Sequence, residues 1–307
     1  MDLFQKCYNF KAVDEAKAAG LYPYCPVVSS KQGATTIMNG TETIMVGSSN
    51  YLGLSGDERV IQAAKNALDK FGTGCTGTRL FNGTTELHIE LENKLEKFVG
   101  KEAVTVFPTG FQSNVAIIPA LAQANDIIFS DAANHESILT GNRVSTAECL
   151  EFPHNDLSAL EKMLKEADPR KGKLIIVDGV FSFDGTLADV PALVRLKNKY
   201  NARLMIDDSH GFGVMGKTGR GTCEYFDLMD QVDVFMATFS KCFASVGGFV
   251  ASNKQVVNYI SHVAGAYTNT AALPPVNVAT ILECLSILEK ELSQLHKQRE
   301  TKNKGRK

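Results

Sequence analysis

The sequence predicts an α/β domain built on a mostly parallel sheet with helices on both faces. The first indication is a series of short apolar runs, rich in Val and Ile, which largely lack the polar alternation of half-exposed strands. The second is that helical patterns, such as residues 156–167 and 190–201, separate several of these runs. Strands that alternate with helices are typical of α/β folds.

In chain order, two amphipathic helices precede the predicted strands. Residues 59–72 and 85–100 both repeat apolar side chains at helical spacing. The predicted strands are residues 103–107, 126–130, 173–179, 202–208, 232–238 and 247–252. These elements place a large domain at residues 46–275, between an N-terminal segment at residues 1–45 and a helix at residues 276–296. The last residues, 297–307, are basic and almost without apolar side chains, so we expect them to be disordered.

The composition argues against several classes of protein. The 307 residues carry a formal net charge of −2 and a pI near 6.3, which does not indicate a nucleic-acid-binding or anionic-membrane surface. Seven cysteines are scattered without a C-x-x-C pair, so neither a zinc site nor a disulfide framework is indicated. The odd count and the lack of a secretory leader favour the cytoplasm. No apolar run approaches the roughly 20 residues of a transmembrane segment.

Polar side chains follow five of the predicted strands, at the sheet edge where open α/β folds bind ligands. Gly110 follows the strand at 103–107, where a helix N-terminus favours an anion such as phosphate. His135 follows the strand at 126–130. The other candidates, after the next three strands, are Ser182, then Asp207 and His210, and then Thr238, Ser240 and Lys241.

Each candidate has an ordinary structural explanation on its own: the glycine junction as a turn, the histidine or Asp207 as a helix cap, the lysine as a surface residue. Their joint occurrence at successive strand ends is harder to explain in that way. Pyridoxal phosphate would use all of them, because it needs a Schiff-base lysine, a carboxylate at the pyridine nitrogen and a flat side chain on the ring. Hydroxyls and a helix N-terminus would hold its phosphate. The small residues around Lys241 in TFSKCFASVGGF (238–249) leave room for this cofactor.

The sequence also resembles the α-oxoamine synthases, fold-type I pyridoxal phosphate enzymes that condense an amino acid with an acyl-CoA and release carbon dioxide. The resemblance runs from about residue 20 to about residue 285. Its motifs are NYLGL (50–54), GTGCTGTRLFNGTTELHIELE (72–92), PTGFQSN (108–114), DAANHES (131–137), DGVFSFDG (178–185), DDSHGFGVMGKTGRG (207–221), TFSKCFASVGG (238–248) and YTNTAALPP (267–275). Their number and order make the resemblance specific, and it implies a seven-stranded sheet.

The resemblance implies roles for individual residues around the cofactor ring. Lys241 matches the Schiff-base lysine, which also serves as the base that removes the substrate α-proton. Asp207 matches the partner of the pyridine nitrogen, and His135 matches the histidine stacked on the ring. His210 and Ser182 match groups near the phenolic oxygen.

The resemblance also implies contacts to the phosphate and the substrate. Asn50 matches an asparagine close to the substrate carboxylate, which His135 is also expected to contact. The expected phosphate ligands are the backbone of Gly110 and Phe111, the hydroxyls of Thr238 and Ser240, and Thr270 from the partner subunit. A contribution from the partner implies a homodimer with shared active sites.

The sequence departs from the family in a few places. The family's D-E-A-H reads Asp207-Asp208-Ser209-His210 here, and we expect little effect because the two middle residues usually face away from the cofactor. Cys242 replaces a common Ser or Ala. We also expect the family's small C-terminal domain, which supplies an arginine for the substrate carboxylate, to be missing. The helix before it, with Val278 and Leu285 on its apolar stripe, would then be partly uncovered and activity impaired.

Several alternatives stay open within and outside the family. Four segments, including YPYCPVVSSKQG and RVSTAECLEFPHND, resemble bacterial serine palmitoyltransferases, which use serine and a long-chain acyl-CoA. Glycine C-acetyltransferase, 8-amino-7-oxononanoate synthase and 5-aminolevulinate synthase share most motifs, so serine, glycine and alanine all remain candidate substrates. Outside the family, the alternatives are an aminotransferase or desulfurase, or a chain that binds the cofactor without turnover.

Overall fold

The computed structural model describes residues 1–291, so the predicted tail at 297–307 and the end of the predicted helix at 276–296 lie outside the described residues. The chain divides into two compact units, the first being Met1–Gly47 and the second beginning at Ser48. The second unit contains every predicted strand.

The first unit contains two short helices and a hairpin. The helices are α1 (Gln5–Tyr8) and α2 (Ala12–Ala18), and the antiparallel strands are β1 (Thr35–Met38) and β2 (Thr41–Ile44). Asn39 and Gly40 connect the strands, both with positive φ, as the tight turns of hairpins require. Thr36 is the only buried residue of this unit, all of which is described, so the unit has no apolar core of its own.

The second unit is built on a seven-stranded sheet of order β3-β9-β8-β7-β6-β4-β5. Its strands are β3 (Ala103–Phe107), β4 (Asp126–Asp131), β5 (Glu148–Phe152), β6 (Gly172–Asp178), β7 (Arg203–Asp207), β8 (Val234–Thr238) and β9 (Gly248–Ser252). β9 runs antiparallel to both of its neighbours and the other pairs are parallel, which confirms the predicted mostly parallel sheet. β5 was not predicted: it is an edge strand whose sequence, ECLEF, includes two glutamates, and only Phe152 in it is buried.

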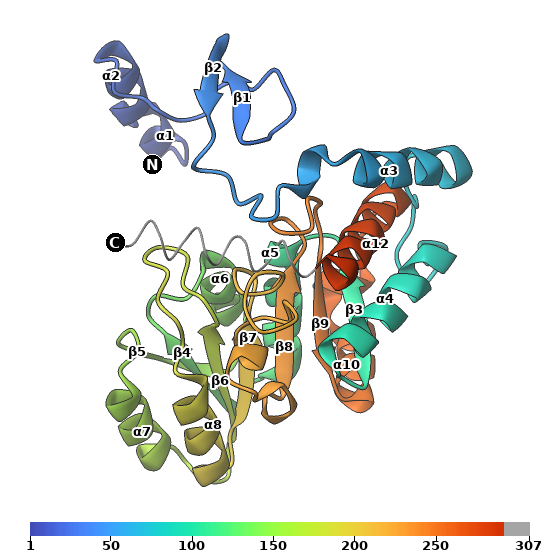
Figure 1. Ribbon diagram of the computed structural model, residues 1–307. Coiled ribbons are helices and arrows are strands. Elements are labelled where there is room, and N and C mark those ends of the chain that lie inside the picture. The colour runs from blue at the N-terminus through green and yellow to red at the C-terminus, as the bar shows by residue number, and fades with distance from the viewer. Residues whose placement is uncertain (292–307) are drawn as a thin grey trace, which may run out of the picture. The chain divides into compact units, whose positions relative to one another are not determined.

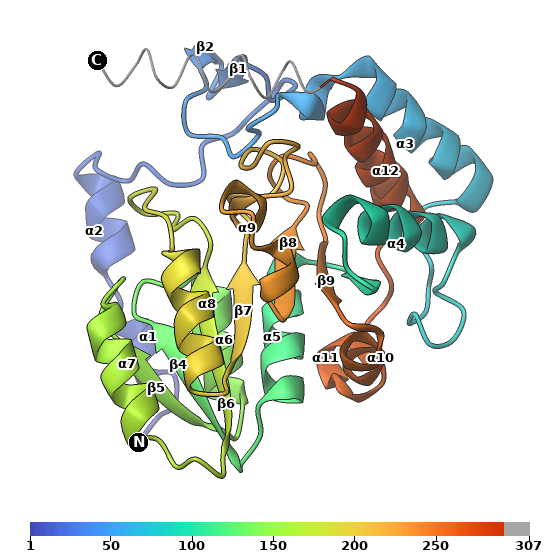
Figure 2. The same cartoon turned by 60° about the horizontal axis from the view of Figure 1, so that its bottom comes forward.

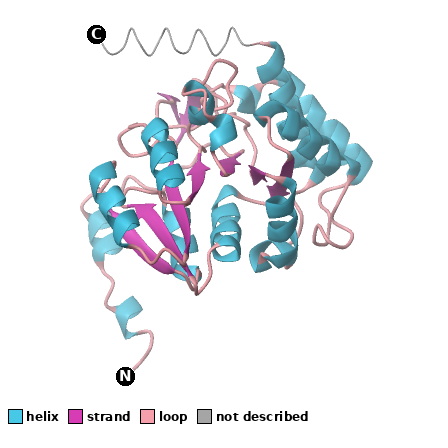
Figure 3. Cartoon of the chain, turned by 90° about the horizontal axis from the view of Figure 1, so that it is seen from below, coloured by secondary structure: helices cyan, strands magenta, loops and turns pink. Residues whose placement is uncertain are grey.

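Helices cover both faces of the sheet (Figures 1 and 3). They are α3 (Glu58–Phe71), α4 (Glu86–Val99), α5 (Gly110–Leu121), α6 (Glu136–Val144), α7 (Leu157–Glu166), α8 (Val190–Lys199), α9 (Thr222–Tyr225), α10 (Lys254–Val263), α11 (Gly265–Thr268) and α12 (Pro275–Lys290). Figures 1 and 2 show α7 and α8 on one face, and α5 and α6 on the other. None of the helices in the described part of the chain combines the length and hydropathy needed to span a bilayer.

Two apolar cores lie on the two faces of the sheet, and alternate residues of each strand contribute to them. Ile175 and Val177 of β6 belong to the core shared with α4, α7, α8 and α12, whereas Leu174 and Ile176 belong to the core shared with α5, α6 and α10. This division follows from the two-residue repeat of a strand, and it explains why the strands read as continuous apolar runs.

The expectation that the last helix would be partly uncovered is wrong for the described residues. α12 packs against α3 and α4. Val278, Ile281 and Leu285 are each 0% exposed, because these neighbouring helices cover the apolar stripe.

Candidate active site

A cavity of about 260 Å³ lies at the carboxyl ends of the central strands. Most of the predicted site residues line it, namely Gly110, Phe111, His135, Asp207, His210, Thr238, Ser240 and Lys241. A larger cavity of about 530 Å³ opens at the amino ends of the strands. There Asp233 is paired with Lys197 and Arg203, and the other charges are of mixed sign, so we place the active site in the smaller cavity.

Lys241 follows β8 in a turn that continues to Gly247 and Gly248. Burial lowers the pKa of its amine, although the nearby Asp207 and Asp178 carboxyl groups act in the opposite direction. A buried lysine with a lowered pKa is more often in the neutral form, which is the form that reacts with a carbonyl group.

Asp207, at the end of β7, is held by two donors. Its Oδ2 accepts a hydrogen bond from the Asn114 side chain (2.6 Å), and its Oδ1 accepts one from the Ser209 N–H (3.0 Å). Asn114 lies on α5 and also donates to Ser137 Oγ (2.9 Å). The carboxylate is 4% exposed, so these contacts fix its direction in the cavity.

The expectation that both middle residues of Asp207-Asp208-Ser209-His210 face away from the site is wrong for Ser209. Ser209 lines the cavity, and its hydroxyl accepts a hydrogen bond from the Thr238 N–H (3.1 Å). Asp208 does face away, because Thr222 holds its carboxylate in the core. The alternation of side chains along β7 ends at Asp207, so the next two residues do not continue it.

His210 contacts Tyr51, a residue that the sequence analysis did not select. The Tyr51 hydroxyl lies 2.8 Å from His210 Nδ1. Burial, and then the nearby Lys241 side chain, lower the pKa of His210 to about 4, so the ring is neutral near pH 7. With Nδ1 bound to the phenol, the rest of the imidazole is available to the cavity.

The N-terminus of α5 forms the anion-binding end of the cavity. The first turn of a helix leaves its N–H groups without intrahelical acceptors, and Gly110 and Phe111 supply two of them. A Cβ on Gly110 would lie 2.4 Å from Thr238 Oγ1, so only glycine lets the helix start this close to β8. With a lysine, a carboxylate and this phosphate-sized cradle in one cavity, the residues present fit pyridoxal phosphate.

Comparison with known proteins agrees with this assignment. The family described as aminotransferase class I and II matches residues 41–304. A serine palmitoyltransferase of Bacteroides ovatus is 46% identical over 95% of this chain and 74% of its own length. An 8-amino-7-oxononanoate synthase of Thermosipho melanesiensis is 43% identical over 91% of this chain and 71% of its own length.

The chain belongs to the α-oxoamine synthases, within the class I and II aminotransferase family. The α-oxoamine synthases are pyridoxal phosphate-dependent acyltransferases. A solved Sphingomonas wittichii serine palmitoyltransferase superposes with a TM-score of 0.90 at 37% identity, covering 94% of this chain and 73% of that one. Another solved serine palmitoyltransferase, with pyridoxal phosphate as an internal aldimine, gives a TM-score of 0.91 at 34% identity and covers 95% of this chain and 76% of that one.

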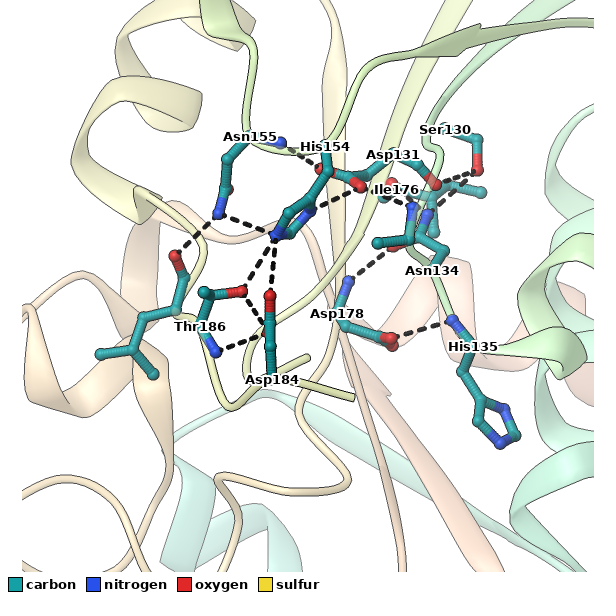
Figure 4. Close-up of polar contacts among 12 residues, drawn as sticks. Ser130, Asp131, Asn134, His135, His154, Asn155, Ile176, Asp178, Asp184 and Thr186 are labelled. Carbon is teal, nitrogen blue, oxygen red and sulfur yellow. Dashed lines mark hydrogen bonds and ion pairs between the residues drawn. The ribbon is translucent and has the colours of Figure 1, made fainter. Parts of the chain in front are cut away.

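Asp178 is a further residue in the synthase cavity that the sequence analysis did not select. It pairs in register with Asp207 on the neighbouring strand. Its Oδ2 accepts a hydrogen bond from the His135 N–H (2.9 Å), as Figure 4 shows. Burial and then Asp207 raise the pKa of Asp178 well above its usual range. The signal was in the sequence, because Asp178 ends an apolar run just as Asp207 does.

Three predicted site residues do not line this cavity of the synthase. Ser182 is exposed in the loop after β6. Asn50 donates its side-chain amide to Ser55 Oγ (2.8 Å). Thr270 lies between α11 and α12, and its implied role concerns the partner's site, which a single chain does not contain.

Proposed function

We propose that this α-oxoamine synthase is a serine palmitoyltransferase, which condenses L-serine with a long-chain acyl-CoA, releases carbon dioxide and CoA, and supplies a 2-amino ketone to sphingolipid biosynthesis. The observation that carries the reaction type is the meeting of Lys241, Asp207 and the α5 N-terminus in one cavity. Identities of 43–46% to three serine palmitoyltransferases support serine as the amino acid.

The proposed roles follow from the geometry. Gly110, Phe111, Thr238 and Ser240 would hold the phosphate of pyridoxal phosphate, and Lys241 would hold its aldehyde carbon. When bound, this cofactor withdraws electrons from the substrate carbon next to the amino group. Two further phosphate and ring contacts, Thr270 from a partner subunit and Ser182, remain part of the proposal.

Lys241 has a second role in this proposal, as the general base. Once the amino acid replaces it, its freed amine takes the α-proton of the substrate. Its lowered pKa suits this role, because a neutral amine is then available at a pH closer to 7.

The cavity walls orient the reacting groups. Asn114 and the Ser209 N–H aim the Asp207 carboxylate, which would hold the positive charge of the pyridinium nitrogen. His135 also lines the cavity, and its ring would stack on the cofactor and, with Asn50, contact the substrate carboxylate. Neutral His210 would donate or accept at the phenolic oxygen.

We also propose that the enzyme is a cytoplasmic homodimer. The seven cysteines are free, as expected for a reducing compartment. The match of Thr270 to a threonine that reaches the partner's phosphate site supports the dimer. Sedimentation of the purified protein tests the dimer.

The test of the function is CoA release with a panel of substrates. Serine, glycine and alanine are each supplied with a long-chain or a short-chain acyl-CoA. Serine with the long-chain thioester should give the highest kcat/KM. Preference for alanine would instead favour an 8-amino-7-oxononanoate synthase, which the 43% identity to that enzyme makes the second candidate.

A further inference from the structure

Residues 180–187 form a small hairpin that begins two residues after Asp178, which lines the cavity. Val180 and Leu187 pair in an antiparallel bridge at its base. Its tip carries Ser182 and is exposed, and the neighbouring Phe183 is 100% exposed. A hairpin this short is not stable alone, so its position depends on what holds its base.

His154, from the turn between β5 and α7, contacts both arms of this hairpin. The His154 and Phe181 rings meet edge to face, with centroids 4.3 Å apart. His154 Nε2 lies 2.9 Å from Thr186 Oγ1 on the other arm. Thr186 in turn donates from its hydroxyl to Asp184 Oδ1 (2.8 Å), which extends the contact toward the tip. Figure 4 shows His154 with Thr186 and Asp184 on this side.

The opposite nitrogen of His154 binds Asp131, at the end of β4. Nδ1 lies 3.0 Å from Asp131 Oδ1, and because a carboxylate only accepts, Nδ1–H is the donor. Asp131 is 1% exposed and also accepts from the N–H groups of Ala133 (2.8 Å) and Asn155 (2.9 Å). The histidine is therefore anchored to a rigid, buried group.

The segment that begins at Asp131 leads directly to the cavity. Asn134 donates to the Ile176 carbonyl (2.8 Å) and accepts from the Asp178 N–H (2.9 Å), so it is locked to β6. The next residue, His135, lines the cavity. Figure 4 shows this chain of contacts from His154 through Asp131 and Asn134 to Asp178.

We propose that His154 is a positioning residue of this synthase: it joins the 180–187 hairpin to the Asp131–His135 segment and so fixes Ser182 relative to the cavity. The effect on catalysis rests on the proposed function, since it assumes that Ser182 contacts the cofactor. The other part of the proposal, that His154 holds the 180–187 hairpin in place, does not depend on the proposed function.

Two conservative variants each remove one end of the link, either the contact of His154 with Asp131 or its contact with Thr186. Asparagine places its amide nitrogen near the Nδ1 position, so His154→Asn keeps the bond to Asp131 and loses Thr186. Glutamine reaches the Nε2 position, so His154→Gln keeps the bond to Thr186. Thr186→Val removes the same contact from the hairpin side, and Thr186→Ser restores the hydroxyl. These last two variants answer the question if His154→Asn does not fold.

Chymotrypsin cleavage at Phe183 reports the hairpin directly, in the full chain without substrates. A protease needs a locally opened segment, so a released hairpin is cut faster. We expect cleavage after Phe183 to be at least about tenfold faster in His154→Asn, His154→Gln and Thr186→Val, which corresponds to loss of one or more hydrogen bonds. Cleavage after Phe81, which is 84% exposed in another loop, is the internal control and should not change.

The catalytic readout uses the protein loaded with pyridoxal phosphate. We expect kcat/KM to fall about tenfold in His154→Asn, His154→Gln and Thr186→Val, with a changed absorbance of the bound cofactor, and to stay within about threefold in Thr186→Ser. Equal cleavage at Phe183 in Thr186→Val and the unaltered protein would overturn the proposal, as would unaltered cleavage in both histidine variants. If serine proves to be the wrong substrate, the cleavage results still stand, so the two failures are distinguishable.

Discussion

The cavity at the carboxyl edge of the sheet and the buried layer behind it each hold one of two consecutive aspartates. Asp207 lines the cavity, where Asn114 and the Ser209 N–H leave room for a ligand. Asp208 is 0% exposed, and both of its oxygens accept from Thr222. An aspartate side chain therefore serves catalysis in the cavity and stability in the buried layer. The difference lies in the hydrogen-bond donors: Asn114 and the Ser209 N–H hold Asp207, whereas Thr222 holds both oxygens of Asp208.

The largest expected effect comes from Lys241, at the centre of the cavity. Lys241→Ala should lower turnover at least about 10²–10⁴-fold, because no other lysine of the described residues lines the cavity, where an amine must hold the cofactor and take the α-proton. Borohydride should fix the cofactor on Lys241 in the unaltered protein, as mass spectrometry of peptides would show. Lys217→Ala, at an exposed lysine, is the control. Fixation on a different lysine would contradict the assignment.

The next effect should come from Asp207. Asp207→Asn cannot balance a positive charge on the pyridine nitrogen, so exchange of the substrate α-proton should fall by several orders of magnitude. The urea midpoint should change little, because the two side chains are nearly the same size and Asn114 can reorient its amide. NMR can follow exchange of the substrate α-proton in Asp207→Asn, and Asp69→Asn, at an exposed aspartate, is the control. Near-normal exchange would show that Asp207 has another task.

Asp208 should show the reverse behaviour, with an effect on stability and little on turnover. Burial raises the pKa of Asp208 to about 7 from its usual value of 3.8, although hydrogen bonds from Thr222 act against this. The folded state thus favours the protonated form. The stabilisation is fully present below about pH 4 and is lost as the pH rises through 7, by an amount on the order of 1–4 kcal/mol.

Asp208→Asn removes this titration. The free energy of unfolding in urea should fall less between pH 5 and pH 8 in the variant than in the unaltered protein. The activity should stay within several-fold, since Asp208 does not line the cavity. If both proteins lose stability equally over this pH range, the Asp208 carboxyl group does not titrate as described.

The sequence was sufficient to predict the sheet and most of the cavity, because both depend on local signals. Apolar runs marked the central strands, and polar residues at their ends marked the site. The edge strand β5 lacked that signal, since its outward residues are polar. Asp178 carried the same signal as Asp207 and was overlooked.

Other contacts had no local signal at all. Tyr51 and His210 are 159 residues apart and meet only through the fold. The exposure of Ser182 likewise follows from the 180–187 hairpin, whose two arms contact His154 from a separate strand end. Such contacts join segments that are far apart in the chain, so periodicity and motif spacing do not reveal them.

The smallest expected effect tests the edge of the cavity at Tyr51. Tyr51→Phe keeps the ring and removes only the hydroxyl that contacts His210 Nδ1. The histidine would then be free to exchange between its two neutral tautomers, which differ in whether Nδ1 or Nε2 carries the proton. Only one of them presents the required donor or acceptor to the cavity. The loss of the hydroxyl's contacts with His210 and Ser49 predicts a decrease in kcat of about two- to tenfold, with the urea midpoint almost unchanged. Nitrogen chemical shifts of His210 should move from one tautomer toward a mixture, and this can be measured without cofactor.

Tyr225→Phe, at a tyrosine that is 56% exposed, is the matched control. If Tyr51→Phe and Tyr225→Phe behave alike in both measurements, Tyr51 only packs against His210, and its hydroxyl does not fix the tautomer of the histidine.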